Sequence, residues 1–319
     1  MLKIQKIRPL LEIGGINLLL FKLEDKILGG RSGVEYMYKI MMNADPEDYP
    51  RLLKSMYALW GGGVLHLENP QTYNEKIQWI KLYDSTPQKT CLADKYAVRD
   101  WIKEKIGEKY LVPIIGVWDS FNDIDFTALP NAFVLKCNHG SGWNAIISNK
   151  LNENFQEWNS IFTKWLGTNY AFVAGLELQY KDIKPKIICE KLIEENIIDY
   201  RVYCFSGIPT FIKVTQHNHK SAGGYDSALY YPDWTKCEFR MIQGYGDLNI
   251  PKPKPLDELI TLASTLCQEF RFVRVDFYVV NDKVYFSEMT FTPNSGYERF
   301  DNIQTAIRFG DMIETHHGK

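Results

Sequence analysis

The strongest constraint on the fold is a strand pattern near the C-terminal end of the chain, VRVDFYVVNDKVYFSEMTFT at residues 273–292. Two runs rich in β-branched and aromatic residues flank the pair Asn281-Asp282, which suits a tight turn. The pattern therefore predicts an antiparallel hairpin. Similar hairpin patterns occur earlier in the chain, around KCNHGSG and at Ser206-Gly207, and they are interspersed with amphipathic helical segments. This succession favours an α+β fold over a doubly wound parallel sheet.

Charged residues share one face of this hairpin. Side chains alternate along a strand, so Arg274, Asp276 and Tyr278 lie on one face of the first strand, while Glu288 and Thr290 share a face of the second. The short turn makes the two carboxylates cross-strand neighbours, and such a pair needs a compensating positive charge. A structural salt bridge to the arginine is one solution. A bound Mg²⁺, which takes one or two carboxylates together with phosphates, is the other.

The stretch KCNHGSG begins with Lys136 at the end of a predicted strand and carries the glycine-bounded sequence Gly140-Ser141-Gly142. A loop of this kind can point its N–H groups inward at an anion, and the lysine can hold a phosphate as a point charge. The alternative is an ordinary hairpin turn in which His139 is a structural residue. The loop alone does not decide between these interpretations.

Segments before this loop predict mostly helix. Thr72, followed three residues later by Glu75, has the pattern of a capping box at a helix start. The stretch CLADKYAVRDWIKEKI predicts a further helix that passes through Lys95. In such a helix Lys95 could form an ordinary surface salt bridge with Asp100 or Glu104.

The composition narrows the class of protein. The formal net charge is −2 and the pI is near 6.3, so we expect no nucleic-acid partner. The six cysteines occur singly and form no CxxC motif, which indicates buried thiols in a reducing cytosol and not a zinc site. The apolar run INLLLF predicts a core segment, with a docking surface as the alternative, and it is far too short for a membrane span. We therefore expect a cytoplasmic protein with no integral membrane segment.

Eight motifs in order along the chain resemble the ATP-grasp fold, and most closely the TupA-like family associated with teichuronopeptide and capsular polysaccharide biosynthesis. The resemblance covers roughly residues 69–313. It implies two α+β lobes, with antiparallel sheets, that clasp ATP. The expected domains are a mostly helical region at 1–68, a lid lobe at 69–189 and a lobe with the metal site at 190–319. The motifs are NPQTYNEKIQWIKLYD, LADKYAVR, PIIGVWD, FVLKCNHGSG, IICEKLI, IDYRVYCFSGIPTFI, FVRVDFYVVNDKVYFSEMTFTPNSG and FGDMI.

The resemblance also implies roles for individual residues. The two phosphate-binding lysines fall on Lys95 and Lys136, and the mobile loop over the phosphates on Gly140, Ser141 and Gly142. The hinge that meets adenine and ribose falls on Glu190, Lys191, Leu192 and Ile193, and the Mg²⁺ positions on Asp276, Glu288 and Thr290.

The sequence departs from the family pattern at two positions. Thr290 stands where many ATP-grasp enzymes have an asparagine, so the second metal site is expected to be weaker or completed by water. Asn294 replaces a glycine of the family sequence FTPGSG, which is expected to change acceptor contacts and not ATP contacts.

The implied reaction is ADP-forming ligation of a carboxylate to an amine through an acyl phosphate, with ATP and Mg²⁺ as cofactors. The guanidinium groups of Arg274 and Arg201 are the expected ligands of the acyl phosphate or the carboxylate. The implied partners are a uronic acid of a surface polysaccharide or its precursor, an amine or amino acid, and other enzymes of polysaccharide biosynthesis. A kinase on the same fold and a non-catalytic interaction protein are the alternatives. For tryptophans such as Trp60, Trp143 and Trp234, stacking on a sugar is weighed against ordinary packing.

Overall fold

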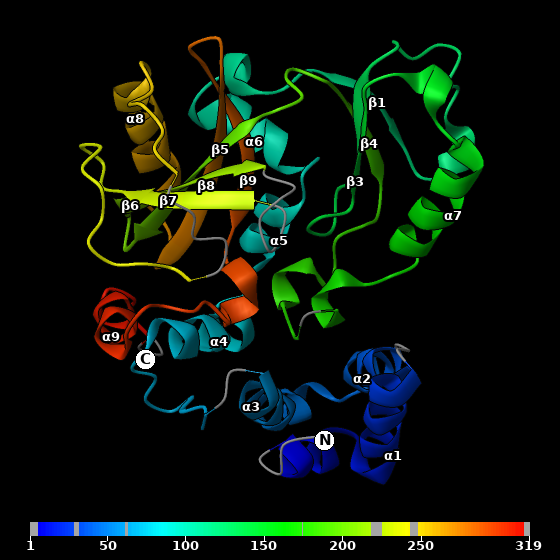
Figure 1. Ribbon diagram of the computed structural model, residues 1–319, viewed down its shortest axis with the longest axis vertical. Coiled ribbons are helices and arrows are strands. Elements are labelled where there is room, and N and C mark those ends of the chain that lie inside the picture. The colour runs from blue at the N-terminus through cyan, green and yellow to red at the C-terminus, as the bar shows by residue number, and fades with distance from the viewer. Residues whose placement is uncertain are drawn as a thin grey trace.

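The computed structural model describes residues 6–28, 32–60, 63–173, 175–217, 225–242 and 248–315. Its described residues form two antiparallel sheets with helices around them, so the expected α+β class is confirmed (Figure 1). No helix in these ranges is both long and apolar enough to span a membrane.

The larger sheet has five strands in the order β7-β6-β5-β8-β9. Tight turns join two pairs of its neighbouring strands: Ser206 and Gly207 have φ of 46° and 77°, and Asn281 and Asp282 have φ of 51° and 61°. Two successive left-handed residues match the right-handed twist of a hairpin, and they confirm both turns predicted from the sequence. The strands are β5 (Ile198–Phe205), β6 (Ile208–His217), β7 (Tyr225–Tyr230), β8 (Phe272–Val280) and β9 (Lys283–Thr290).

One face of this sheet is apolar throughout. Val202, Val275 and Phe277 are fully buried there, against α8 (Leu256–Cys267) and α6 (Val98–Lys105). The opposite face carries the polar side chains, as the alternation of residues predicts.

The smaller sheet has four strands in the order β1-β4-β2-β3. Its outer face, away from the larger sheet, buries Phe133, Leu135 and Ile187 against α7 (Phe155–Leu166) (Figure 1). The predicted hairpin around KCNHGSG is confirmed, because β2 pairs with β3. The strands are β1 (Ile114–Trp118), β2 (Phe133–Cys137), β3 (Asn144–Ile147) and β4 (Ile187–Lys191).

Helix α4 (Tyr73–Tyr83) begins with the capping box predicted from the sequence. The Thr72 side chain accepts a hydrogen bond from the Glu75 backbone N–H, and the Glu75 carboxylate accepts one from the Thr72 N–H. The helix packs against α9 (Ile303–Asp311) beneath the five-stranded sheet (Figure 1).

The continuous helix expected through Lys95 is wrong. The chain forms α5 (Pro87–Ala93) and then α6, with a turn between them at 94–97. The turn has a local cause: the Asp94 carboxylate accepts hydrogen bonds from the N–H groups of Tyr96 and Ala97, a typical Asx turn.

The N-terminal helices α1 (Ile7–Leu28), α2 (Ser32–Met42) and α3 (Tyr49–Trp60) pack together at one end of the molecule (Figure 1). In the run INLLLF, Leu18 is fully buried, whereas Ile16 and Leu20 are exposed. The run therefore contributes to the core through only part of its residues.

Packing bears on the expected domain boundaries. Leu92, Val98 and Ile102 of α5 and α6 belong to the core of the five-stranded sheet, and the four-stranded sheet begins only at Ile114. The boundaries at 68 and 189 stay a prediction, with this packing favouring a lid lobe that begins nearer 114. Short 3-10 helices complete the fold at Pro46–Asp48, Glu108–Tyr110, Phe121–Asp123, Lys150–Asn152, Tyr170–Phe172, Leu178–Tyr180 and Pro293–Gly296.

Among the six cysteines, Cys91 is exposed, which departs from the expectation of buried thiols. Cys237 is partly buried, and the remaining four are buried without disulfides.

Candidate active site

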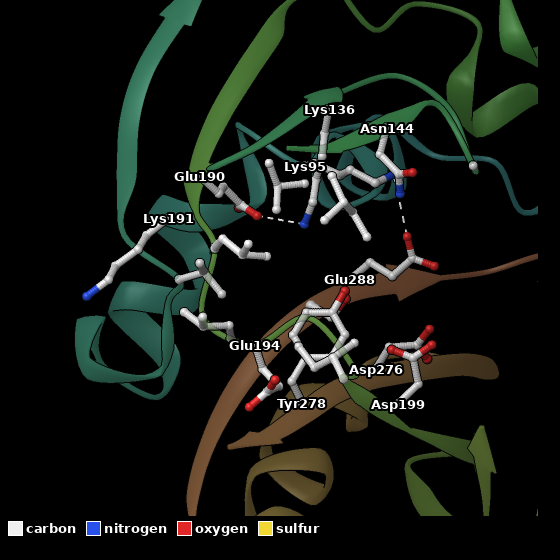
Figure 2. Close-up of a pocket in the computed structure, with 18 of the residues that line it drawn as sticks. Lys95, Lys136, Asn144, Glu190, Lys191, Glu194, Asp199, Asp276, Tyr278 and Glu288 are labelled. Carbon is white, nitrogen blue, oxygen red and sulfur yellow. Dashed lines mark hydrogen bonds and ion pairs between the residues drawn. The ribbon is translucent and has the colours of Figure 1, made fainter. Parts of the chain in front are cut away.

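A cavity of about 320 Å³ lies between the two sheets, and we call it the inter-sheet cavity (Figure 2). Its walls come from β2 and β4 on one side, from β5, β8 and β9 on the other, and from the connector at 192–197. Most of the predicted site residues therefore meet here although they come from separate parts of the chain. They are Lys95, Lys136, Ser141, Gly142, Glu190, Lys191, Leu192, Ile193, Arg201, Asp276 and Glu288.

Lys136 is fixed by an acidic partner on the neighbouring strand. Its Nζ donates to the Glu190 Oε2 at 2.6 Å (Figure 2). Arg99 Nη1 lies 3.4 Å from the Glu190 Oε1. Burial lowers the pKa of Lys136, but the charge and hydrogen bond of Glu190, together with Tyr278 and Glu288, outweigh burial and keep the pKa above its usual value. The lysine is therefore a permanent cation in the cavity wall. Glu190 pairs with this lysine in the structure, and its contact with adenine or ribose stays a prediction.

Lys95 reaches the cavity from the turn between α5 and α6. Its Nζ donates to the Gly140 carbonyl at 2.5 Å and lies 3.4 Å from the Glu288 Oε2. The backbone N–H of Lys95 also donates to the Asn138 carbonyl. These contacts join the lysine to the KCNHGSG loop and to the acidic strand, in place of the surface pairs with Asp100 or Glu104.

The two carboxylates are cross-strand neighbours in the register that the sequence predicts, Asp276 opposite Glu288. Arg274 bridges them: its guanidinium donates two hydrogen bonds to Asp276, at 2.7 Å and 2.5 Å, and one to Glu288 at 3.0 Å. Thr290 accepts from the same guanidinium and donates to Glu288 at 2.9 Å. The salt bridge left open by the sequence is thus present.

The surroundings shift the pKa values of Asp276 and Glu288 in opposite directions. Burial raises the pKa of Asp276 to about 6, in spite of Arg274. Burial also raises the pKa of Glu288, but Lys95 and Arg274 outweigh it and lower this pKa to about 2. Glu288 is therefore the firmly ionised member of the pair.

The acidic pair fits a magnesium ion. Both carboxylates line the cavity across from Lys136, and two carboxylates are what Mg²⁺ uses when phosphates supply further ligands (Figure 2). No group of three or more His, Cys, Asp or Glu side chains is placed to hold a metal within the described part of the chain. The protein alone therefore offers an incomplete metal site, of the kind that a phosphate-bearing ligand completes.

Arg201 of β5 lies beside Asp276 with its Nε 4.0 Å from the carboxylate. Its Nη2 donates to Asp199 at 2.7 Å, but its Nε is buried without a hydrogen-bond partner among the described residues. The two arginines predicted for catalysis thus face different spaces, since Arg201 lines the inter-sheet cavity and Arg274 does not.

Part of the wall of the inter-sheet cavity is aliphatic. Val112, Val134 and Ile146 line it together with the hinge residues Leu192 and Ile193. Flat heteroaromatic rings bind to aliphatic walls of this kind with edge contacts to a backbone segment.

Sequence reasoning missed several residues of this cavity. A carboxylate that follows a strand has many surface roles, so no pattern singled these residues out. They are Glu194, Glu195 and Asp199 in the wall. Arg99, which pairs with Glu190 from behind, was missed as well, whereas Tyr278 was placed on the face of Asp276 but given no role.

The KCNHGSG loop is anchored at its base and exposed at its tip. Asn138, His139 and Gly140 are buried, whereas Ser141 and Gly142 are exposed. A side chain at Gly140 would place its Cβ 2.6 Å from the Trp143 ring and 2.8 Å from Tyr170, so glycine is required there. The resemblance implies that this loop moves. In this structure Ser141 and Gly142 are the residues with room to do so.

His139 is part of the loop's support. Its ring nitrogens lie 3.3 Å from the Asn138 side-chain oxygen and 3.1 Å from the Trp165 carbonyl, and burial lowers its pKa. This placement supports the structural interpretation of the histidine.

A second cavity, of about 460 Å³, adjoins the first and shares Ser141 and Glu288 with it. We call it the aromatic cavity, because Trp60, Tyr170, Tyr180 and Tyr297 line it. Its other lining residues are polar: Glu177 and Arg274, and the hydroxyl and amide side chains of Thr290, Thr292, Asn294 and Ser295.

A buried charge network lies under the aromatic cavity. The Lys81 Nζ donates to the Gly175 carbonyl at 2.8 Å and to the Ser295 hydroxyl at 2.7 Å. Thr292 donates to the Glu177 carboxylate. Burial lowers the pKa of Lys81 to about 7 and raises that of Glu177, while the attraction between the two charges opposes both shifts.

The three tryptophans considered for sugar stacking have different surroundings. Trp60 lies in the wall of the aromatic cavity and Trp143 in that of the inter-sheet cavity. Trp234 stacks on Tyr230, with ring centroids 4.3 Å apart, and is a packing residue of the five-stranded sheet.

Two antiparallel sheets that close on a cavity with two lysines and a paired carboxylate define an ATP-grasp architecture. The chain belongs to the TupA-like ATP-grasp family, whose model matches residues 75–314. Both the fold and the family inferred from the sequence are thereby confirmed. Residues before 75, including Trp60, lie outside the match.

Solved structures give more distant similarities. D-alanine–D-alanine ligase from Bacillus anthracis complexed with ATP is 16% identical, with a TM-score of 0.39 over 64% of this chain and 56% of that one. L-amino acid ligase from Bacillus licheniformis is 10% identical, with a TM-score of 0.42 over 79% and 56%. N5-carboxyaminoimidazole synthetase from Staphylococcus aureus complexed with ADP is 15% identical, with a TM-score of 0.38 over 76% and 57%. The chain thus spans little more than half of each of these structures. A search of curated proteins found no match.

Proposed function

We propose that the protein is an ADP-forming ligase that joins a carboxylate to an amine at the expense of ATP. The observation that carries the proposal is the convergence of Lys95, Lys136, Asp276 and Glu288 on one cavity of a TupA-like ATP-grasp protein. Solved ligases among the similar structures agree with this choice of reaction.

The cavity suggests how ATP is held. The adenine ring fits the aliphatic part of the wall formed by Val112, Val134 and Ile146, next to the backbone of the hinge at Lys191–Ile193. Glu194 and Glu195, just past the hinge, are placed to accept hydrogen bonds from the ribose hydroxyls. Lys136, held by Glu190, then faces the phosphates.

The phosphates fit between the lysines and the acidic pair. When bound, Mg²⁺ would be held by Asp276 and Glu288 and would neutralise phosphate charge. Lys95 stabilises charge from the other side and ties the loop to the site through the Gly140 carbonyl. Ser141 and Gly142 lie at the loop tip, where they can exclude water over the phosphates.

The reaction proceeds in two steps. A carboxylate oxygen of the first substrate attacks the γ-phosphorus, and the bond to the ADP oxygen breaks. The amine then attacks the acyl carbon, phosphate leaves with the bonding electrons, and the nitrogen loses a proton. The protein has to position the groups and balance charge, for which Arg201 and Arg274 on either side of Asp276 are suited.

The carboxylate substrate that we propose is a hexuronic acid of a surface polysaccharide or its precursor, and the amine is an amino acid or an amino compound. The choice of a polysaccharide uronic acid is supported by the association of the TupA-like family with polysaccharide biosynthesis. In this scheme the protein acts in the cytoplasm next to other enzymes of polysaccharide biosynthesis.

The test is an ADP-release screen of the purified chain with Mg·ATP, a panel of uronic acids and pooled amino acids. Replacing the amines with hydroxylamine should trap the acyl phosphate as a hydroxamate. ADP release that needs a uronic acid, with hydroxamate formation, is the expected result. Release of ADP with phosphoryl transfer to a hydroxyl and no hydroxamate would identify a kinase instead. ATP binding without turnover on any member of the panel would favour a non-catalytic interaction protein.

A further inference from the structure

The aromatic cavity differs from the inter-sheet cavity in the chemistry of its walls. Its apolar surface comes from tryptophan and tyrosine rings, and none of its described lining residues is aliphatic. Flat amphipathic rings cover the C–H face of another ring while leaving room for hydrogen bonds at its edges. Alkyl chains gain more from the branched aliphatic walls seen at the other cavity.

Hydrogen-bonding groups surround these rings. Thr290, Thr292 and Ser295 offer hydroxyls, Asn294 an amide and Glu177 a buried carboxylate. A wall that combines ring faces with many short polar groups matches a ring-shaped ligand that carries several hydroxyls.

The N-terminal helices supply the key aromatic side chain. Trp60, at the end of α3, is 37% exposed and meets Tyr297 edge-on, with ring centroids 5.6 Å apart. Tyr57, one turn earlier, stacks on the same tyrosine at 6.0 Å. Helix α3 is held firmly in the core through Met56 and Leu59, so the Trp60 ring has a fixed position with an open surface.

The backbone on the other side of the cavity is strained. Asn294 and Ser295 have φ of 48° and 52°, in the left-handed region, and Gly296 follows with φ of 70°. Non-glycine residues in this region concentrate at ligand sites. Asn294 and Ser295 line the same cavity as Trp60, and Asn294 is the position that the sequence singled out for acceptor contacts.

We propose that the aromatic cavity is a saccharide subsite, in which Trp60 from outside the family match determines specificity. The inference rests on the proposed function, which puts nucleotide phosphates in the adjoining cavity. The sugar ring stacks on Trp60 and Tyr297, and its reacting group lies at the shared wall of Ser141 and Glu288. The helices before residue 75 are thus part of the substrate site.

Binding can be tested without turnover. Glucuronic acid, galacturonic acid and glucuronic acid β-linked to N-acetylglucosamine are titrated by calorimetry or saturation-transfer NMR into the full chain with Mg²⁺ and a non-hydrolysable ATP analogue. Hexanoic acid and leucine are the aliphatic comparison ligands. The variants are Trp60→Ala and Trp60→Leu, the second of which keeps apolar bulk but lacks a flat ring. Trp101→Ala is the matched control, because Trp101 packs on the core of the other face of the sheet and lines neither cavity.

Both Trp60 variants should weaken saccharide binding about tenfold and leave affinity for the ATP analogue unchanged within about twofold. Trp101→Ala should bind both ligands like the wild type. The inference is overturned if no saccharide of the panel binds, if Trp60→Leu binds saccharides as the wild type does, or if hexanoic acid binds as tightly as the sugars. Failure of ADP release would contradict the proposed function alone, since these titrations need no reaction.

Discussion

The two cavities share a wall at Ser141 and Glu288, yet they are built in opposite ways. In the inter-sheet cavity the apolar surface is mostly aliphatic, with Trp143 and Tyr278 as its aromatic members. In the aromatic cavity tryptophan and tyrosine rings supply the apolar surface, next to Glu177, Arg274 and Glu288, and the Lys81 side chain is fully buried. The first arrangement suits a polyanion with a flat base, and the second a neutral or weakly charged ring.

The two cavities also differ in the parts of the sequence that form them. The inter-sheet cavity is formed by strands within the family match, whereas the aromatic cavity needs Trp60 from before it. We infer that residues within the family match bind the nucleotide, while the helices before residue 75 help to select the second substrate. Three predictions test this separation.

The largest effect is expected from the acidic pair of the inter-sheet cavity, Asp276 and Glu288. Asp276→Asn or Glu288→Gln should abolish turnover, because each removes a carboxylate expected to hold Mg²⁺, and loss of one preorganised charge costs about 10²–10³ in rate. Turnover is measured at limiting Mg²⁺, with circular dichroism to check the fold. Asp282→Asn, at the exposed hairpin turn, is the control. Near-normal activity of either variant would exclude its residue from the metal site.

A smaller effect is expected from the two lysines. Lys95→Met and Lys136→Met should each weaken ATP binding by about 2–5 kcal/mol, because a buried phosphate then lacks a cation. Calorimetry of ATP binding measures this, with the exposed Lys103→Met as control. Lys136→Met also leaves the Glu190 carboxylate without its lysine partner. Adding Glu190→Gln should therefore restore the free energy of unfolding without restoring the affinity for ATP. If Lys95→Met binds ATP like the wild type, Lys95 only tethers the loop.

The smallest effect is the pH dependence of the free energy of unfolding that Lys81 causes. Burial lowers the pKa of Lys81 to about 7 in the folded protein from 10.5, so between these values the unfolded chain binds the extra proton. The stability from this group is therefore present above pH 10.5 and is lost as the pH falls through 7. Between pH 7 and 9 the free energy of unfolding should rise by about 1 kcal/mol per pH unit more in the wild type than in Lys81→Met. Urea denaturation at several pH values measures the slopes, with Lys54→Met as the control. Equal slopes would show that Lys81 stays charged when buried.

The elements that sequence reasoning predicted are those governed by local rules. The period of a strand and a two-residue turn are enough to place Asp276 opposite Glu288, and a capping box is enough to start α4 at Thr72. The order of the motifs that resemble the family then indicated that Lys136 and the glycine loop lie near Asp276 and Glu288. The break at Asp94 escaped notice because an Asx turn competes with helix propensity through a single side chain.

The rest depends on contacts between distant segments. Nothing near Trp60 in the sequence indicates that its ring meets Tyr297, and nothing near Lys81 indicates a partner at Ser295. Such pairs arise only when helices and loops from the two ends of the chain pack together. In the sequence, a lysine that becomes buried, such as Lys81, also cannot be told from an ordinary surface residue of an amphipathic helix.

The contact between these ends has a consequence for biosynthesis. The Gln78 side chain donates to the carbonyls of Ser295 and Gly296, and the Asn74 side chain donates to that of Glu298. Helix α4 therefore leaves the ribosome more than two hundred residues before its final partners exist. Contacts of such long sequence separation form late and slowly, and the apolar faces awaiting them are exposed to aggregation meanwhile. During synthesis, chaperone binding to α4 should persist until the segment after β9 has emerged.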